Sequence, residues 1–336
     1  MTPATIRDVA KQAGVSVATV SRVLNKSYSV REGTSQKVLA VIEDLDYSPS
    51  PTARRLSIGR THTVGVIIPF LTLPSFVERL RGVESALALS EYDLVLFSAD
   101  TPEKVDHYFN DLSRRDRADG VIIISLHPDE TYVARFRKSA MPAVLLDAQH
   151  PDISSIVVDD VAGGYKATQH LIELGHTRIA YLSDYLDNPF KFVAMRHRFQ
   201  GYHQALEEAS ISYRPEYQKQ GELGGREAVA IAKQMLVEPD RPTAIFAASD
   251  IHAVGVLKAA QELNIRVPQD LSVIGFDGIR DSEHLDITTV CQPLFDSGVV
   301  SVNTLLSAIN EPSDVPEKIV LPTKLIVRGT TVPPSG

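Results

Sequence analysis

From residue 61 onward, short apolar runs alternate with amphipathic segments, and this alternation restricts the possible folds more than any other feature of the chain. The runs are rich in Val, Ile, Leu and Phe, as is typical of strands buried on both faces. Between them, apolar residues recur with helical spacing; in residues 75–89, for example, Phe76, Val83 and Leu87 share one side. The predicted strands are 63–68, 93–98, 120–125, 143–147, 155–159, 178–183, 244–249 and 271–277. Apolar strands separated by helices indicate an α/β fold with parallel sheets.

The length of the chain indicates more than one globular unit. Eight strands with their helices are too many for one small sheet, and 336 residues are too many for one small core. We therefore predict a body of two doubly wound α/β lobes. The chain has no run of ~20 apolar residues and no secretory signal segment at its start. Its single cysteine, Cys291, excludes an internal disulfide, so we expect a cytoplasmic protein.

Residues 5–25, TIRDVAKQAGVSVATVSRVLN, carry the strongest local pattern in the chain. Thr5 and Asp8 form a capping-box pattern at the start of a first helix, and Gly14 suits the left-handed residue that ends it. Ser16 can then cap a second short helix. Two short helices joined by a turn of about three residues that contains glycine make a helix-turn-helix.

A third amphipathic segment, residues 34–45, would complete a three-helix headpiece around a small apolar core. Residues 1–60 contain nine Lys/Arg and five Asp/Glu, a net charge of +4, although the whole chain carries −8. An acidic body is repelled by nucleic acid, whereas a basic N-terminal module is attracted to it. The charge asymmetry therefore favours a headpiece that binds DNA. The alternative is a three-helix bundle that binds a protein.

The second helix of a helix-turn-helix enters the major groove with its N-terminal residues nearest the base edges. Arg22 can bond to guanine through two N–H groups, and Val17 and Ala18 can contact thymine methyl groups. The short polar residues suited to phosphate contacts are Thr5, Ser16, Thr19, Ser21 and Asn25. These residues are the predicted contacts of the headpiece with double-stranded DNA.

Residues 48–60, SPSPTARRLSIGR, connect the headpiece to the body and contain a short basic stretch that favours a helix. Pro49 and Pro51 hold the chain extended, and the helix-forming residues that follow stop at Gly59. A helix of about two turns is marginal in water by itself. We therefore expect this segment to become helical only when a partner covers it.

With these motifs the chain resembles a known family. TIRDVAKQAGVSVATVSRVLN, followed by DYSPSPTARRL, is similar to the DNA-binding headpiece and hinge of the lactose-repressor (LacI/GalR) family of bacterial transcription regulators. The resemblance continues through ADGVIII, RFQGYHQAL, PTAIFAASDIHAVGVLKA and DLSVIGFDG, and so covers nearly the whole chain. It implies a body like that of periplasmic binding proteins of type I, with a ligand in the cleft between two lobes.

The resemblance also implies how the chain is divided. In the family the chain crosses between the two lobes three times, which here falls near residues 160, 291 and 322. The implied parts are a headpiece at 1–46, a hinge at 47–60, an N-terminal lobe at 61–160 with 292–322, and a C-terminal lobe at 161–291 with 323–332. The two lobes are therefore expected to be discontinuous in sequence.

The family hinge folds into a short helix when two copies meet on the operator. This implies phosphate contacts for Arg54 and Arg55, and insertion of Leu56 into the minor groove, where it kinks the DNA. A two-fold dimer presents two helix-turn-helix units to a pseudo-palindromic operator. Family tetramers use a C-terminal leucine heptad, which the final residues RGTTVPPSG do not show. We therefore expect a homodimer.

Ligands of open α/β sheets bind beyond the carboxyl ends of the strands, so residues that follow the predicted strands are the candidates for effector binding. Asp277 ends one strand, and its carboxylate can accept hydrogen bonds from sugar hydroxyls; the alternative is a cap on the next helix. The resemblance implies effector contact for Asp277 and Arg198, with Arg196 nearby, and places Asp147 and Asp250 at the cleft. A guanidinium can bind vicinal hydroxyls through paired bonds, although a surface ion pair is the alternative for Arg198.

Two departures from the family pattern concern the effector. Ser249 stands where asparagine is more common, and residues 69–76 differ from the usual Asn-Pro-aromatic loop. Phe70 and Phe76, and Phe190 with Tyr185 on the other lobe, are candidates to stack on a ligand ring; the alternative is a place in the core. The chain contains no tryptophan, which removes one usual platform for sugars.

Patterns typical of enzymes are missing from the sequence. It contains no G-x-S-x-G, no G-x-x-x-x-G-K-[ST] and no H-E-x-x-H, and its ten histidines are scattered. We expect no cofactor and no metal site. The prediction is a transcription regulator, most simply a repressor, that a small carbohydrate controls. The alternatives are a regulator that senses a nucleobase, a nucleoside or a protein, and a periplasmic solute-binding protein; an enzyme is least favoured.

Overall fold

The computed structural model describes residues 4–24, 30–47, 60–113, 117–222, 224–313 and 315–335. It consists of two compact units, residues 1–62 and residues 63–336, which we describe separately. None of the helices in the described ranges has both the length and the apolar character that crossing a membrane requires.

The described residues of the first unit form a bundle of three helices, α1 (Ile6–Ala13), α2 (Val17–Leu24) and α3 (Glu32–Asp44). Asp8 Oδ2 accepts hydrogen bonds from the backbone N–H of Thr5 at 2.9 Å and from its hydroxyl at 2.7 Å, at the start of α1. The buried core consists of Val9, Ala10, Ala13, Val20, Val23 and Val38. α3 begins two residues earlier than predicted. The N–H groups of Thr34 and Ser35 bond to the carbonyl oxygen of the N-cap residue, Arg31, so the first turn starts at Glu32.

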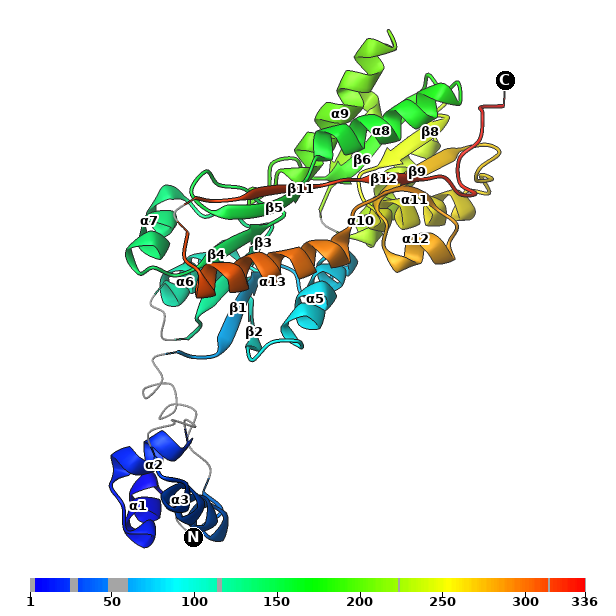
Figure 1. Ribbon diagram of the computed structural model, residues 1–336. Coiled ribbons are helices and arrows are strands. Elements are labelled where there is room, and N and C mark those ends of the chain that lie inside the picture. Colours follow the sequence, from blue (N-terminus) through cyan, green and yellow to red (C-terminus); the bar gives the residue numbers. More distant parts are fainter. Residues whose placement is uncertain are drawn as a thin grey trace. The chain divides into compact units, whose positions relative to one another are not determined.

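The body contains two six-stranded sheets (Figure 1). In the first sheet all neighbouring strands are parallel. Its strands, in spatial order, are β11 (Lys318–Leu321), β5 (Ser154–Val158), β4 (Ala143–Leu146), β3 (Gly120–Ile124), β1 (Thr63–Ile68) and β2 (Asp93–Ser98). Every residue of β1 and β3 is buried, which explains why all of them except Thr63 are apolar or glycine.

The second sheet is also parallel, except for one antiparallel edge strand. Its strands, in spatial order, are β12 (Lys324–Ile326), β10 (Thr288–Cys291), β9 (Ser272–Asp277), β8 (Ala244–Ala247), β6 (Ile179–Asp184) and β7 (Gln218–Gly221). The chain therefore passes between the sheets three times: after β5, after β10 and after β11.

Helices cover both faces of each sheet, which buries the alternate side chains of every central strand. On the first sheet, α5 (Pro74–Leu87) and α13 (Leu294–Asn310) lie side by side on one face, and α6 (Pro102–Leu112) and α7 (Glu130–Lys138) lie on the other (Figure 1). On the second sheet, α8 (Asp160–Glu173) and α9 (Ala194–Glu208) oppose α10 (Gly225–Leu236) and α11 (Asp250–Glu262). A short helix α12 (Arg280–His284) and a 3₁₀ turn (Pro215–Tyr217) complete the second lobe.

All eight predicted strands are present, with ends that differ by up to two residues. The prediction omitted β7, β10, β11 and β12. Two of these, β11 and β12, are short and lie at sheet edges, where one side is open and a polar residue is tolerated. The sequence of β7, QKQG, has no apolar residue, so its pairing with β6 depends on the neighbouring strand rather than on its own pattern.

Candidate functional site

The outward side of α2 is the candidate DNA interface of the headpiece. Gly14, with φ 64°, ends α1 in the left-handed region, and the Ser16 hydroxyl accepts the Thr19 N–H at 3.1 Å and so caps α2. Val20 and Val23 are buried against the other helices. Val17 is 41% exposed, and Ala18 and Arg22 are exposed as well.

Five of the predicted DNA contacts, Val17, Ala18, Thr19, Ser21 and Arg22, lie on α2; Ser16 caps this helix, and Thr5 is the N-cap of α1. Thr5 and Ser16 are exposed, each beside the first turn of a helix, and Thr19 and Ser21 are half-buried on α2. The predicted contacts outside the described residues are Asn25, Arg54, Arg55 and Leu56.

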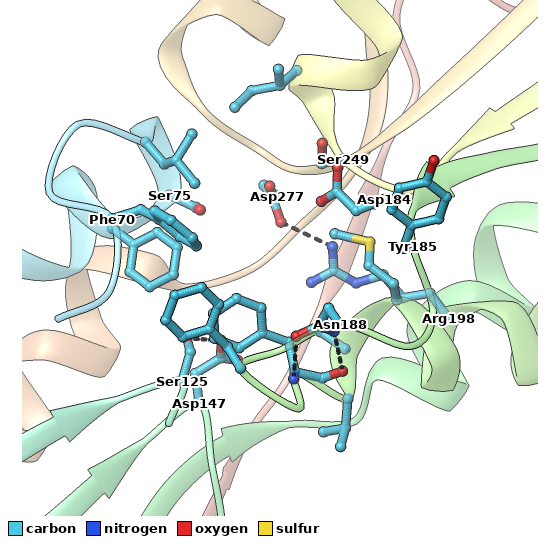
Figure 2. A pocket seen from close by; sticks show the side chains of 18 of the residues that line it. Phe70, Ser75, Ser125, Asp147, Asp184, Tyr185, Asn188, Arg198, Ser249 and Asp277 are labelled. Atoms are coloured by element: carbon cyan, nitrogen blue, oxygen red, sulfur yellow. Dashed lines mark hydrogen bonds and ion pairs between the residues drawn. The ribbon is translucent and has the colours of Figure 1, made fainter. Parts of the chain in front are cut away.

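A cavity of about 440 Å³ lies between the two lobes of the body (Figure 2). Polar residues at the carboxyl ends of strands from both sheets line it, as expected for open α/β sheets. These residues are Ser125 after β3, Asp147 after β4, Asp184 at the end of β6, Ser249 after β8 and Asp277 at the end of β9.

Seven of the nine predicted effector residues lie on the wall of this cavity: Phe70, Phe76, Asp147, Phe190, Arg198, Ser249 and Asp277. Tyr185 lines it too, with 48% of its surface exposed. Arg196 is exposed outside the cavity and donates from Nη2 to the carbonyl oxygen of Leu186 at 3.0 Å. Contact of the lining residues with an effector stays a prediction.

Asp250 does not line the cavity, although Ser249 does, because the strand turns into α11 at this point. The Asp250 carboxylate is fully buried and holds the turn after β9. Its Oδ2 accepts the N–H groups of Gly278 at 2.7 Å and Ile279 at 2.9 Å, and its Oδ1 accepts the Thr289 hydroxyl at 2.6 Å. The expectation that Asp250 faces the cleft is therefore replaced by a structural role.

Arg198 is the centre of a buried group of charges at the wall of the cavity. It is 3% exposed; its Nε donates to Asp160 Oδ1 at 2.8 Å, and its Nη1 donates to the Ala248 carbonyl at 2.7 Å and to Asp277 Oδ1 at 3.3 Å. The guanidinium carbon lies 3.7 Å from the centre of the Phe276 ring. Arg198 is thus part of a buried cluster and not of a surface ion pair.

The charges of this cluster are only partly balanced. Burial raises the pKa of Asp160 and of Asp277, and Arg198 opposes both shifts. Burial also opposes the charged form of Arg198, but Asp160 and Asp277 outweigh it and raise the pKa of the guanidinium. Arg198 therefore bonds to two buried carboxylates, and the positive charge of Arg79 also lowers the pKa of both. Oδ2 of Asp277 accepts no hydrogen bond from any described residue, so a ligand hydroxyl can bond there.

Three residues at the cavity wall have backbone conformations that non-glycine residues rarely adopt. Ser125, Asp147 and Asp277 have φ values of 58°, 62° and 114°. Such conformations cost on the order of 1–3 kcal/mol each and persist where the surroundings enforce them. The Ser125 hydroxyl donates to Asp147 Oδ2 at 2.6 Å, which orients that carboxylate.

A chain of polar contacts connects the two lobes beside the cavity. Arg79 on α5 is 4% exposed; its Nη2 lies 3.1 Å from Asp147 Oδ1 and donates to Gln292 Oε1 at 3.2 Å. Gln292, between β10 and α13, donates from Nε2 to Asp277 Oδ1 at 2.7 Å. We call the series Asp147, Arg79, Gln292 and Asp277 the interlobe chain. It joins a carboxylate of one lobe to a carboxylate of the other.

A histidine connects two further polar residues of the cavity wall. His252 is 3% exposed; its Nδ1 lies 2.6 Å from the Ser249 hydroxyl, and its Nε2 lies 2.9 Å from Asp184 Oδ1. With the proton on Nε2 bonded to Asp184, Nδ1 accepts the Ser249 hydroxyl proton. The Ser249 oxygen also accepts the backbone N–H of His252 at 3.3 Å, which leaves one lone pair for a ligand hydroxyl at the cavity wall.

Sequence reasoning missed several residues of the wall. Ser125 and Asp184 follow the same rule that selected Asp147 and Asp277, since each stands at the carboxyl end of a strand. Arg79 is a charged residue on the otherwise apolar side of α5, which is a signal that the sequence did contain. The remaining missed residues include Asn188, Phe192 and Gln292. Within the described residues, no group of three or more His, Cys, Asp or Glu could hold a metal ion.

Two models of known protein families match the chain, one in the headpiece and one in the body. Residues 5–50 match the family model of bacterial regulatory proteins of the lacI family, and residues 168–331 match that of the periplasmic binding protein-like domain. The first match contains α1–α3, and the second contains most of the second lobe together with α13 and β11.

Relatives of known function align with nearly the whole chain. Catabolite control protein A of Priestia megaterium is 35% identical over 332 residues, which is 97% of this chain and 99% of the relative. The lac repressor dimer bound to operator and the anti-inducer ONPF is similar in structure, with a TM-score of 0.85 and 30% identity over 98% of this chain and 99% of that one. The complex of the transcriptional regulator CelR with cellobiose has a TM-score of 0.72 and 30% identity over 97% and 99%. The predicted fold class and family are confirmed: the chain belongs to the lacI family of bacterial regulatory proteins and is a DNA-binding transcriptional regulator.

Proposed function

We propose that this protein represses transcription by binding a pseudo-palindromic operator as a homodimer, and that a small effector in the interlobe cavity controls this binding. The observation that carries the proposal is the outward side of α2. Val17, an apolar residue at the start of the helix, is 41% exposed beside Ala18 and Arg22, and no element of the described headpiece covers it. A thymine methyl group and a guanine edge in the major groove would cover these residues. Because bacterial DNA lies in the cytoplasm, we place the protein there.

The effector would bind in the cavity, and a carbohydrate is the first candidate. The free Oδ2 of Asp277, the acceptor oxygen of Ser249 and the Asp147 carboxylate are suited to hydroxyl groups. The similarity to the CelR complex with cellobiose supports this choice. A nucleoside is the second candidate, because phenylalanine rings contribute much of the opposite wall. A protein co-regulator is the remaining alternative.

The experiment is operator binding by the full-length protein at fixed salt. Operator sequences are selected from a random library, and affinity is measured by fluorescence anisotropy with a panel of sugars and nucleosides. We expect preference for a symmetric site and a shift of its affinity by at least one compound. If no sequence is preferred over random DNA, the proposal is wrong.

Arg22→Ala tests the predicted base contact. Loss of a bidentate contact to guanine costs ~1–3 kcal/mol, so operator affinity is expected to fall by roughly 5- to 150-fold. Lys258→Ala is the matched control, because it removes one exposed positive charge from the body. Equal effects of the two substitutions would contradict a specific role for Arg22.

A further inference from the structure

Four phenylalanine rings form one wall of the cavity, and we call them the aromatic wall: Phe70, Phe76, Phe190 and Phe192. Phe190 and Phe192 are stacked, with ring centres 5.2 Å apart and planes 7° apart. Phe70, from the first lobe, meets Phe190 edge-on at 5.1 Å and Phe76 at 6.4 Å. The wall therefore combines rings from both lobes, and all four contribute to the surface of the cavity.

The rings of the second lobe are held in place by their own loop. Asn188 closes residues 188–192: its Nδ2 donates to the Phe192 carbonyl at 3.2 Å, and its Oδ1 accepts the Phe192 N–H at 3.1 Å. Phe190 and Phe192 also pack against the apolar core of the first lobe. The aromatic wall is thus built before a ligand arrives, so little ordering entropy is lost when a flat ring binds against it.

Among the described residues, carboxylates outnumber arginines on the polar side of the cavity. The arginines on its wall are Arg79 and Arg198. Arg79 pairs with Asp147 through Nη2, and its buried Nε has no partner among the described residues; Arg198 pairs with Asp160 and Asp277. Two more carboxylates of the wall, Asp184 and Glu222, add negative charge. A phosphate at this wall would therefore meet net repulsion, because the described lining residues include four carboxylates and two guanidinium groups.

We propose, building on the effector-controlled function above, that the effector is an uncharged molecule in which a hydroxylated ring carries a flat apolar ring. The flat ring lies against the aromatic wall, and the hydroxylated ring bonds to Asp277 and Ser249. A volume of about 440 Å³ lies within the range of cavities that hold ligands of this size. Aryl glycosides and nucleosides share this chemistry.

The test is calorimetric binding to the full-length protein without DNA, with matched probes. The pairs are phenyl and methyl glycosides of glucose and galactose, and adenosine with ribose. Adenosine monophosphate and phenyl glucoside 6-phosphate report on the charge. We expect at least one ring-bearing probe to bind about tenfold or more tightly than its partner, and its phosphate to bind about tenfold or more weakly. Binding by a phenyl glycoside or by adenosine identifies which source supplies the ring.

Phe190→Leu and Phe192→Leu test the aromatic wall, because leucine keeps an apolar side chain but removes the flat face. Each is expected to reduce the preference for the ring-bearing probe over its partner to about threefold or less. Phe295→Leu is the control, since Phe295 is 39% exposed and lies outside this cavity. The preference is a ratio measured on one protein sample, so partial unfolding of a variant does not imitate the result.

Two outcomes would overturn the inference. The first is that no ring-bearing probe binds more tightly than its partner; the second is that the phosphates bind as well as the uncharged probes. Operator binding is measured separately on the same preparation. A simple sugar that shifts operator affinity would leave the proposed function intact while this inference fails.

Discussion

Ser249 and Asp250 are neighbours in the chain, yet their side chains serve different parts of the second lobe. The Ser249 hydroxyl faces the cavity, whereas Asp250 binds two backbone N–H groups and a hydroxyl behind it. Asp250→Ala is expected to lower the free energy of unfolding by about 2–4 kcal/mol, because two buried N–H groups lose their acceptor. Asp250→Asn is expected to cost less than about 1 kcal/mol, since its amide can donate to Thr289. Urea unfolding measures both; equal losses would contradict this account.

Asp250 also predicts a dependence of stability on pH. Burial, followed by the nearby charge of Asp277, raises the pKa of Asp250 from 3.8 to about 7. Between these values the folded state binds a proton that the unfolded state does not, so the contribution of Asp250 to stability falls as pH rises from 3.8 through about 7. The difference in stability between the natural protein and Asp250→Asn should therefore shift in favour of the variant over this range. Parallel curves of unfolding free energy against pH would refute the prediction.

At the scale of helices, glycine residues at helix–helix contacts determine how closely two helices can pack. A Cβ added at Gly201 on α9 would lie 2.0 Å from the Val161 carbonyl oxygen on α8. Gly201→Ala is expected to destabilise the body by about 3 kcal/mol, because the two helices must move apart. Gly225→Ala is the control; its nearest neighbour would be 3.6 Å away, and we expect a change within about 0.5 kcal/mol. Thermal unfolding measures both variants.

The turn between α1 and α2 depends on a different property of glycine. Gly14 has φ 64°, and an L-residue there costs roughly 1–2 kcal/mol. Gly14→Ala should increase amide hydrogen exchange throughout α1–α3 in the full-length protein. In Gly33→Ala, whose new Cβ meets nothing within 4 Å, exchange should stay the same or slow. Faster exchange in both variants would argue against a role for the left-handed conformation.

Over the whole body, the interlobe chain is a direct polar connection between the lobes. An effector that bonds to Asp277 or Asp147 contacts a terminal residue of the interlobe chain. A change in the orientation of the lobes would break the hydrogen bond between Arg79 and Gln292. Gln292→Ala is therefore expected to reduce the ratio of operator affinities without and with saturating effector by about threefold or more. Gln261→Ala, an exposed amide on α11, should leave the ratio unchanged. An unaltered ratio in Gln292→Ala would exclude the interlobe chain from the coupling.

Within the part of the chain that the structure describes, the helices of the headpiece and eight of the twelve strands could be predicted because their signals are local. Capping residues, a left-handed glycine and apolar runs act within a few residues of the chain, whatever the rest of it does. Three of the four strands that were missed, β7, β11 and β12, lie at sheet edges, where pairing depends on a single neighbour; the fourth, β10, lies inside the second sheet. Together with the resemblance, the strand-end rule selected Asp147, Ser249 and Asp277 from the polar wall of the cavity, but Ser125 and Asp184 were missed.

The composition of the cavity depended on contacts between distant segments. Arg79 meets Gln292 across 213 residues, and Phe70 meets Phe190 across the two lobes. The direction of Asp250, away from the cleft, follows from the turn into α11 and from the N–H groups that the next strand presents to it. The periodicity of apolar residues does not predict these long-range contacts, because it shows which face of an element is buried but not which distant element covers that face. Packing of the two lobes brings these side chains together, and with them the charge balance and the aromatic wall that select a ligand.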